Sequence, residues 1–346
     1  MTPTETSVLM SIAEVEHYRG PDLYLFIGIS TAGSSVHGAF PVWAALVAPG
    51  SVLRGVDLPE DSSPEQFRRL VRAMRDNPHV HGAVITSHKL RLYRAVDQLL
   101  DHVDPLVGIT HEINSLDTRN GRISGFARDA QSLDIVLDST GAGTHTPRPD
   151  RAVTCIGAGG SAIALMLAMG LDIHTTMASD RAVLRGESTR RGPLTILGRR
   201  QAALDEIRQV QERAGLEHME LALILASDPE QVAQEVRCVA GAVVANATGL
   251  GKLAPGSPLS GPEAFPEGAL AWDFNYRGPL TFLEQARRAS VATEDGWDYF
   301  VAGWAAGLAA ITGNDLTDEL FERFRAASVP LRPNARVIDE RAGYRR

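Results

Sequence analysis

AVTCIGAGGSA, residues 152–162, is the stretch that decides the fold. Its apolar start is typical of a buried strand, its glycines of a turn, and the residues that follow, 161–169, of a helix. Glycines between a strand and a helix permit a tight turn and let a pyrophosphate approach the N–H groups of the helix N-terminus. The spacing Gly-x-Gly-Gly-x-Ala is a variant of the dinucleotide fingerprint, and the alternative is an ordinary strand–helix turn. The predicted binding residues are Gly157, Gly159, Gly160, Ser161 and Ala162.

The end of the next predicted strand, 194–198, indicates which dinucleotide binds. A chain that binds NAD usually places an acidic residue there, which accepts a hydrogen bond from the ribose. This chain has Arg199 and Arg200 instead, and no acid. Guanidinium groups bind phosphate bidentately, whereas two solvated cations are unfavourable at a helix start. The pair therefore favours NADP, which carries a 2′-phosphate.

Strands and helices alternate along the chain, which is typical of parallel sheets covered by helices. Before the glycine stretch, strands are expected at 22–30, at 52–58 and within 82–89, and helices at 39–48, 64–77 and 92–103. After it, strands are expected at 194–198, 221–226, 242–248 and 270–276, and helices at 299–311 and 316–327. The Gly- and Pro-rich segment 138–151 predicts a linker, and the basic segment 178–193 a surface insertion.

Length and composition indicate the class of protein. The chain has 346 residues, 44% apolar and 22% charged, as expected for about two globular domains. Its net charge of -8 disfavours nucleic acid and anionic membranes as partners. No apolar run is long enough for a membrane span, and no secretory signal is visible. Two cysteines, Cys155 and Cys238, are too few for a disulfide framework, so a cytoplasmic location is expected.

The order of short motifs resembles the shikimate dehydrogenase family. The motifs are VITSHK, EINS, RDAQS, IGAGGSA, LGRR, NATGLG, WDFNY and DGWDYFVAG, from about residue 23 to about 315. The resemblance implies an α/β fold with an N-terminal α/β substrate domain (1–140), a Rossmann-type NADP-binding domain (148–292) and C-terminal helices (293–346) that return to the first domain. It also implies reversible hydride transfer between the cofactor and a ring ketone or alcohol.

The resemblance implies roles for individual residues. Lys89 resembles the catalytic lysine, preceded by the threonine of its turn, Thr86, and Asp129 resembles the catalytic aspartate. Asn114 resembles a substrate-binding asparagine, and Tyr276 a tyrosine near the nicotinamide. The strand end predicted to lie against the cofactor comprises Asn246, Thr248 and Gly249.

Departures from the family pattern concentrate where the family binds its substrate. Ser34 can replace the first serine of the carboxylate clamp, but Val36 then stands for the second. Arg128 and its neighbour Ala127 replace the threonine and asparagine before the aspartate, and Gly303 replaces a glutamine. The turn before the lysine also lacks the family's proline. A different substrate is therefore expected, with Arg128 either a surface residue or a new clamp for a carboxylate or phosphate.

Reduction of a ketone needs a proton for the developing alkoxide, and oxidation needs its removal. A lysine does both where partial burial brings its pKa towards neutrality, and a carboxylate can orient it. Lys89 and Asp129 are therefore predicted to act as a pair, and Lys89 is predicted to face, together with Thr86, a cleft between the domains. The alternative for Lys89 alone is a solvated charge at a strand end.

These observations predict an NADP-dependent oxidoreductase for a small polar cyclic alcohol or ketone, a carboxylic acid other than shikimate. Two alternatives stay open: a non-catalytic NADP(H)-binding sensor, and an amino-acid-dehydrogenase-like enzyme for another substrate, such as a folate. A homodimer is a further expectation. No metal is expected, because His79, His81, His88 and His111 lack an acid at ligand spacing.

Overall fold

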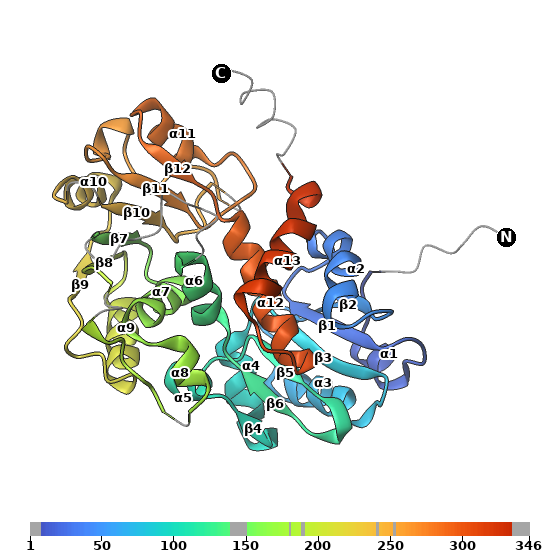
Figure 1. The fold of residues 1–346 in the computed structure, drawn as a ribbon. Helices are drawn as coiled ribbons and strands as arrows, with labels where there is room; N and C mark the ends of the chain where they lie inside the picture. The colour runs from blue at the N-terminus through green and yellow to red at the C-terminus, as the bar shows by residue number, and fades with distance from the viewer. Residues whose placement is uncertain are drawn as a thin grey trace. The chain divides into compact units, whose positions relative to one another are not determined.

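The structure is a computed structural model that describes residues 8–138, 151–179, 181–187, 191–239, 242–251 and 254–333. The chain divides into two units, Met1–Arg128 with Gly303–Arg346, and Asp129–Ala302 (Figure 1). The sequence placed the boundaries at residues 140, 148 and 293 instead. The helix Asp129–Asp138 belongs to the second unit because it packs on a helix of that unit. Most of the predicted linker lies outside the described residues.

The first unit contains a mixed sheet in the order β2-β1-β3-β5-β6-β4. Its strands are β1 (Leu23–Gly28), β2 (Val52–Asp57), β3 (Val80–Ile85), β4 (His102–Val103), β5 (Ser115–Asp117) and β6 (Ser124–Phe126). Strands β1, β2 and β3 are parallel, but β5 runs antiparallel to β3 and β6. The expectation of a purely parallel sheet is therefore wrong here. Strands β5 and β6, of three residues each, are too short for alternation to reveal them.

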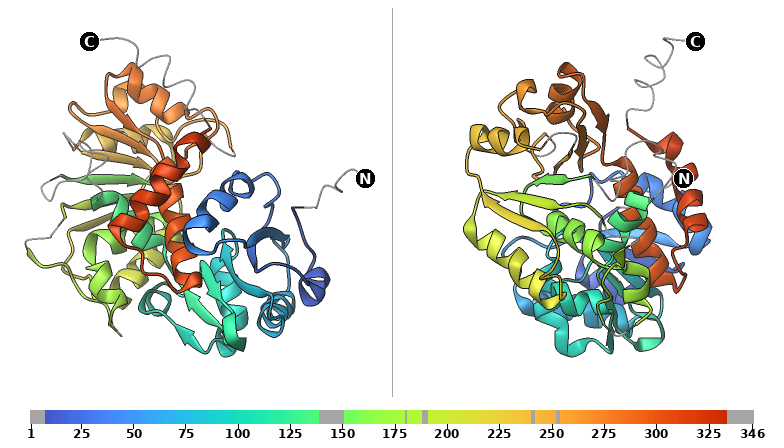
Figure 2. Two further views of the ribbon diagram at one scale, coloured as in Figure 1. Left: turned by 45° about the vertical axis from the view of Figure 1, so that its right-hand side comes forward. Right: turned by 60° about the vertical axis from the view of Figure 1, so that its left-hand side comes forward.

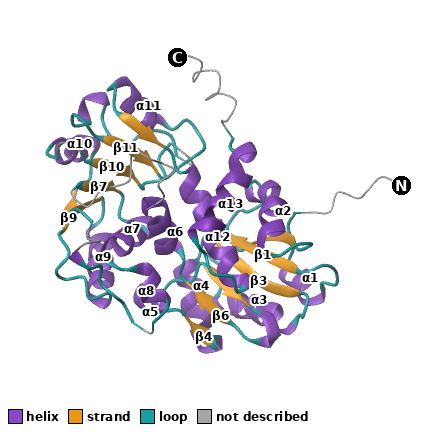
Figure 3. Cartoon of the chain, in the orientation of Figure 1, coloured by secondary structure: helices purple, strands orange, loops and turns teal. Residues whose placement is uncertain are grey.

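Helices surround this sheet, as Figure 3 shows. They are α1 (Ile12–His17), α2 (Val36–Val47), α3 (Pro64–Asp76), α4 (Lys89–Val96), α5 (Pro105–Thr110), α13 (Asp318–Ser328) and the part of α12 (Trp297–Thr312) from Gly303. Helix α3 begins with a capping box of Ser63 and Gln66, with Pro64 in its first turn. Trp304 of α12 stacks on Trp43 of α2 with ring centroids 5.9 Å apart. Trp304 is therefore a core residue.

The second unit contains a parallel sheet in the order β12-β11-β10-β7-β8-β9. The strands are β7 (Val153–Ile156), β8 (Leu194–Gly198), β9 (Leu221–Leu225), β10 (Val243–Asn246), β11 (Leu270–Asp273) and β12 (Ala292–Glu294). The helices are α6 (Asp129–Asp138), α7 (Gly160–Gly170), α8 (Ile173–Met177), α9 (Gln201–Arg213), α10 (Pro229–Arg237), α11 (Thr281–Arg288) and the start of α12. Read from β9, this is the Rossmann order 3-2-1-4-5-6.

Both faces of this sheet are covered, as Figure 2 shows. On one face, Ile156, Leu197 and Val244 pack against α10 and α11 in a single cluster. On the other face, Cys155 and Ile196 are fully buried. Burial on both faces explains why these strands are continuous apolar runs in the sequence.

The basic segment 178–193 is not simply a surface insertion. The Arg191 side chain is 4% exposed, and its guanidinium pairs with Asp138 at 2.5 Å and with Asp134 at 3.1 Å, both on α6. Arg185 pairs with Asp134 as well, and both arginines donate to the Ala168 carbonyl near the end of α7. The segment therefore fastens α6 to α7, and the expectation of a solvated basic stretch is wrong for these two arginines.

Candidate functional site

The glycine turn after β7 has the geometry that a dinucleotide requires. Gly157 has φ +115°, and a Cβ there would lie 2.8 Å from the Ala247 carbonyl oxygen, so only glycine fits without a shift. Gly159 is the N-cap of α7, and a Cβ on it would meet nothing within 4 Å. Gly159 and Gly160 are both exposed, whereas Ala162 is buried. The first N–H groups of α7 therefore stand beside open space.

The strand order brings the other predicted cofactor residues to the same edge. Strand β7 lies between β8 and β10, all parallel. The turn after β10, with Thr248 and Gly249, and the residues after β8 are thus at the carboxyl edge that the glycine turn occupies. The chain leaves β7 towards β8 and β10 lies on its other side, so this is the switch point where such sheets bind ligands.

Arg199 and Arg200 are exposed at the start of α9, where Arg200 is the N-cap. No side chain caps this helix, and its first turn carries no acidic residue. Orphan N–H groups and two guanidinium groups together make a place for an anion. The preference for NADP over NAD stays a prediction.

Asn246 and Asp273 face each other across neighbouring strands, β10 and β11, in register. The Asn246 amide donates to Asp273 Oδ1 at 3.1 Å, and its own oxygen accepts from the backbone N–H and the hydroxyl of Thr248. Burial raises the pKa of Asp273 to about 6. The sequence analysis missed Asp273. The available signal was an acid directly after the apolar residues of the predicted strand 270–276.

Tyr276 follows β11 in a cluster of aromatic rings. Its ring lies 5.3 Å from that of Trp297 and 4.5 Å from that of Phe300, and Trp297 is 3% exposed. Trp297 is therefore a core residue. The predicted role of Tyr276 beside the nicotinamide stays a prediction.

In the first unit, β3 ends at Ile85, and Lys89 is the first residue of α4, not a residue ahead of a helix at 92–103 as expected. The reason is His88, which has φ 69° and so turns the chain sharply. Its Nε2 lies 2.8 Å from the Leu58 carbonyl oxygen, and its ring packs edge-on against Phe67. This fixes the start of the helix that carries Lys89.

Thr86 and Ser34 lie near the carboxyl ends of the parallel strands of the first unit. Thr86 donates its backbone N–H to Ile27, and Ser34 accepts from the backbone of Val36 at 3.4 Å. Two further residues there were missed: the buried Thr31 donates its hydroxyl, at 2.6 Å, and its backbone N–H to Asp57 Oδ1.

Arg128 is 8% exposed, so the surface alternative is wrong. Its guanidinium lies 3.6 Å from Asp104 and over the ring of Phe126, 5.0 Å from the centroid. Its backbone N–H donates to Asn114 Oδ1 at 3.0 Å. Asn114 thus holds the residue that precedes Asp129. If Arg128 clamps a substrate carboxylate or phosphate as predicted, its guanidinium would contact both that anion and Asp104.

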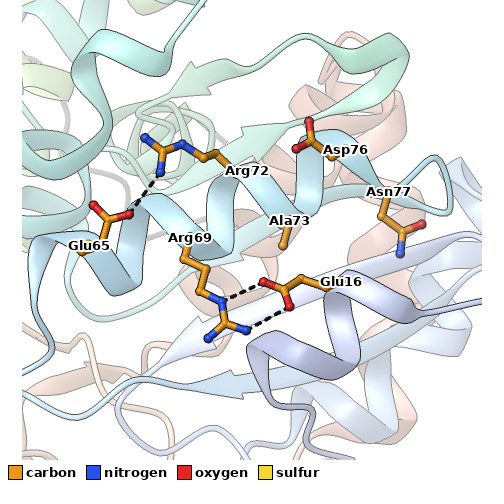
Figure 4. Close-up of a pocket in the computed structure, with 7 residues that line it drawn as sticks. All are labelled: Glu16, Glu65, Arg69, Arg72, Ala73, Asp76 and Asn77. Atoms are coloured by element: carbon orange, nitrogen blue, oxygen red, sulfur yellow. Dashed lines mark hydrogen bonds and ion pairs between the residues drawn. The ribbon is translucent and has the colours of Figure 1, made fainter.

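Metal sites, surface hollows and membrane-spanning helices are the other features that could indicate a function for the described residues. No group of three possible metal ligands occurs among them. A hollow of about 330 Å³ beside α3 is lined by two exposed ion pairs, Arg69 of α3 with Glu16 of α1, and Arg72 with Glu65, both on α3 (Figure 4). In the same part of the chain, no helix combines the length and apolar character that a membrane crossing requires.

One unit with the Rossmann strand order and one unit with a mixed sheet, in a single chain, define a class of two-unit α/β folds. The chain has the fold of the shikimate and quinate dehydrogenases, as the sequence motifs predicted. No protein-family model and no curated protein matches it.

Solved structures carry the comparison. Quinate dehydrogenase from Corynebacterium glutamicum in complex with NAD has a TM-score of 0.64 at 18% identity, over 88% of this chain and 99% of that chain. Shikimate 5-dehydrogenase from Listeria monocytogenes, in complex with shikimate and NAD, has a TM-score of 0.64 at 16% identity, over 88% of this chain and 96% of that chain. Shikimate 5-dehydrogenase from Thermus thermophilus, in complex with NADP(H) and shikimate, has a TM-score of 0.58 at 21% identity, over 88% of this chain and 99% of that chain.

Proposed function

We propose that this chain is an NADP-dependent oxidoreductase of the shikimate dehydrogenase type, acting on a small, polar, cyclic alcohol or ketone. The observation that supports it most is the open glycine turn after β7 at the switch point of a Rossmann sheet. The similar enzymes from Corynebacterium, Listeria and Thermus hold NAD, NAD and NADP(H). The choice of NADP rests on Arg199 and Arg200 at the acid-free start of α9.

The bound cofactor would accept or supply the hydride, and the chain's own residues would handle the proton. When hydride adds to a ketone carbon, Lys89 Nζ gives a proton to the developing alkoxide, and in the reverse direction it takes the proton from the alcohol. By the family resemblance, Asp129 is the carboxylate that would orient the ammonium group. Positioned acid–base catalysis contributes about 10²–10⁴-fold to the rate. We therefore expect Lys89→Met to lower kcat by that factor and to leave the Kd for NADPH unchanged.

The substrate is proposed to be a carboxylic acid other than shikimate. Arg128 is a buried cation just before Asp129, where the family pattern has threonine. A Cβ at Gly303 would meet nothing within 4 Å, so the position of the family's glutamine has room for a differently shaped substrate. Arg128→Met should raise the substrate KM. Thermal unfolding is measured in parallel, since the guanidinium also pairs with Asp104.

The first experiment is a titration with NADPH and NADH by nicotinamide fluorescence, followed by NADP with shikimate, quinate and a panel of other cyclic hydroxy acids, monitored by absorbance. Tight NADPH binding with turnover of a panel acid other than shikimate is the expected result. Rapid shikimate oxidation would refute the altered substrate. Binding of NADPH without turnover of any acid would favour the non-catalytic sensor, and binding of neither nucleotide would overturn the proposal.

A further inference from the structure

A buried carboxylate, Asp273, stands at the centre of a hydrogen-bond network at the carboxyl ends of β10 and β11. It is fully buried, and its Oδ1 accepts three hydrogen bonds. Besides the Asn246 amide at 3.1 Å, the donors are the backbone N–H and the side-chain amide of Asn275, both at 2.9 Å. An acceptor with three donors and no exposure to solvent fixes its partners strongly.

Through the two asparagines, Asp273 holds the whole turn that follows β10. The Asn246 oxygen accepts from the Thr248 N–H at 3.0 Å and from its hydroxyl at 2.7 Å. The Thr248 hydroxyl in turn accepts from the Leu250 N–H at 3.2 Å. The Leu250 carbonyl accepts from the amide of Asn275 at 3.3 Å. Turn 246–250 is therefore closed at both ends by residues that Asp273 orients.

This turn lies directly against the glycine turn. Ala247, its second residue, places its carbonyl oxygen 2.8 Å from where a Cβ of Gly157 would be, and the Thr248 nitrogen is 3.1 Å from the same point. Backbones this close leave no room for one turn to move without the other. A displacement of turn 246–250 therefore changes the surface that a dinucleotide would meet.

We propose that Asp273 is a positioning residue, which holds turn 246–250 against the glycine turn and thereby sets the affinity for the nicotinamide cofactor. The inference rests on the proposed function for its cofactor. Asp273 itself is buried, so it acts through Asn246 and Asn275 and not by touching the ligand. Burial raises the pKa of the Asp273 carboxyl, because removing a carboxylate from water is unfavourable.

The test compares Asp273→Ala and Asp273→Asn with a control for general destabilisation, Asp172→Ala. Asp172 caps α8 by accepting a hydrogen bond from the Thr175 N–H. It follows the C-terminal end of α7, whereas the glycine turn precedes the N-terminal end of that helix. Losing such a cap costs about 1 kcal/mol without disturbing the proposed site. We expect Asp273→Ala to raise the NADPH Kd at least tenfold, Asp273→Asn to raise it less because Oδ1 stays an acceptor, and Asp172→Ala to change it less than twofold.

Amide hydrogen exchange at Thr248 and Leu250 gives a readout that needs no cofactor. Exchange there should be faster in both Asp273 variants and unchanged in Asp172→Ala. Unchanged exchange, or a wild-type Kd in folded Asp273→Ala, would overturn the inference. If that variant does not fold, an unchanged Kd and unchanged exchange in Asp273→Asn would do so. If wild type binds neither nucleotide, the proposed function fails and so does the affinity part of the inference, while exchange still tests the positioning.

Discussion

The variant Gly157→Ala tests whether the glycine turn after β7 is held tightly against its neighbouring turn. Its expected effect is on the stability of the protein. At φ +115° an L side chain is strained by about 1–3 kcal/mol. The new Cβ would also stand 2.8 Å from the Ala247 carbonyl oxygen, which is backbone and has to shift. Overpacking of this kind costs about 1–3 kcal/mol more. We therefore expect a total loss of about 2–6 kcal/mol in the free energy of unfolding.

The matched control is Gly159→Ala, two residues further along the same turn. Gly159 has no neighbour within 4 Å of a Cβ, so its substitution should change stability by less than about 0.5 kcal/mol. In dinucleotide folds, however, the second glycine is where the pyrophosphate approaches the backbone. Gly159→Ala should therefore weaken NADPH binding at least tenfold in a fully stable protein.

The assays are urea unfolding followed by fluorescence, and NADPH titration of each variant. For a unit of this size, 1 kcal/mol corresponds to about 2–4 °C in Tm, so Gly157→Ala should also melt about 4–24 °C below wild type. Equal stability of Gly157→Ala and wild type would refute the close approach of the two turns. Unchanged NADPH binding by Gly159→Ala would refute the placement of the pyrophosphate.

Three further predictions concern charged groups of the second unit. The double substitution Arg199→Ser, Arg200→Ser should raise the NADPH Kd about 10²–10⁴-fold and leave the NADH Kd unchanged, since a hydrogen bond to a charged group contributes about 1.5–3 kcal/mol and two such groups are removed; equal losses for both nucleotides would contradict 2′-phosphate recognition. Arg191→Met should lower the free energy of unfolding by about 1.5–3 kcal/mol, because it removes a buried guanidinium that pairs with Asp134 and Asp138; Arg208→Met, in an exposed pair, should cost under about 1 kcal/mol. Because the pKa of Asp273 is raised from 3.8 to about 6, the native state holds this proton to higher pH than the unfolded chain, so stability should fall by about 3 kcal/mol as pH rises from about 4 to 6 and level off above; urea unfolding against pH should show that loss in wild type and not in Asp273→Asn.

Five of the six strands of the second sheet could be predicted, but only three of the six strands of the first, for a physical reason. Strands β7, β8 and β10 are buried on both faces, so each is an apolar run that a turn signal ends. Strands β5 and β12 have three residues each, too few for any periodicity. The helix expected at 92–103 begins three residues earlier, at Lys89 of α4, and this difference has another cause. A left-handed histidine, His88, starts that helix, and histidine gives no such signal in a sequence.

The candidate site divides in the same way. Glycines at a strand end have a conformational meaning that spacing alone reveals, so the turn at Gly157 was predictable. Asp273 was not, because its role depends on register: only the pairing of β10 with β11 sets it opposite Asn246, 27 residues away in the chain. An acid at a strand end is ordinarily solvated, and no local pattern distinguishes one that three donors surround.

Charge patterns fail for the same reason where partners are distant in the sequence. Read alone, Arg185 and Arg191 belong to a polar, basic stretch that a solvated loop would explain. Their partners, Asp134 and Asp138, lie one helical turn apart on α6, about 50 residues earlier, so both carboxylates face the same side of that helix. Since α6 begins at Asp129, the fastened helix carries the proposed catalytic aspartate at its other end. A segment that resembles a dispensable insertion therefore sets the position of a helix on which the proposed chemistry depends.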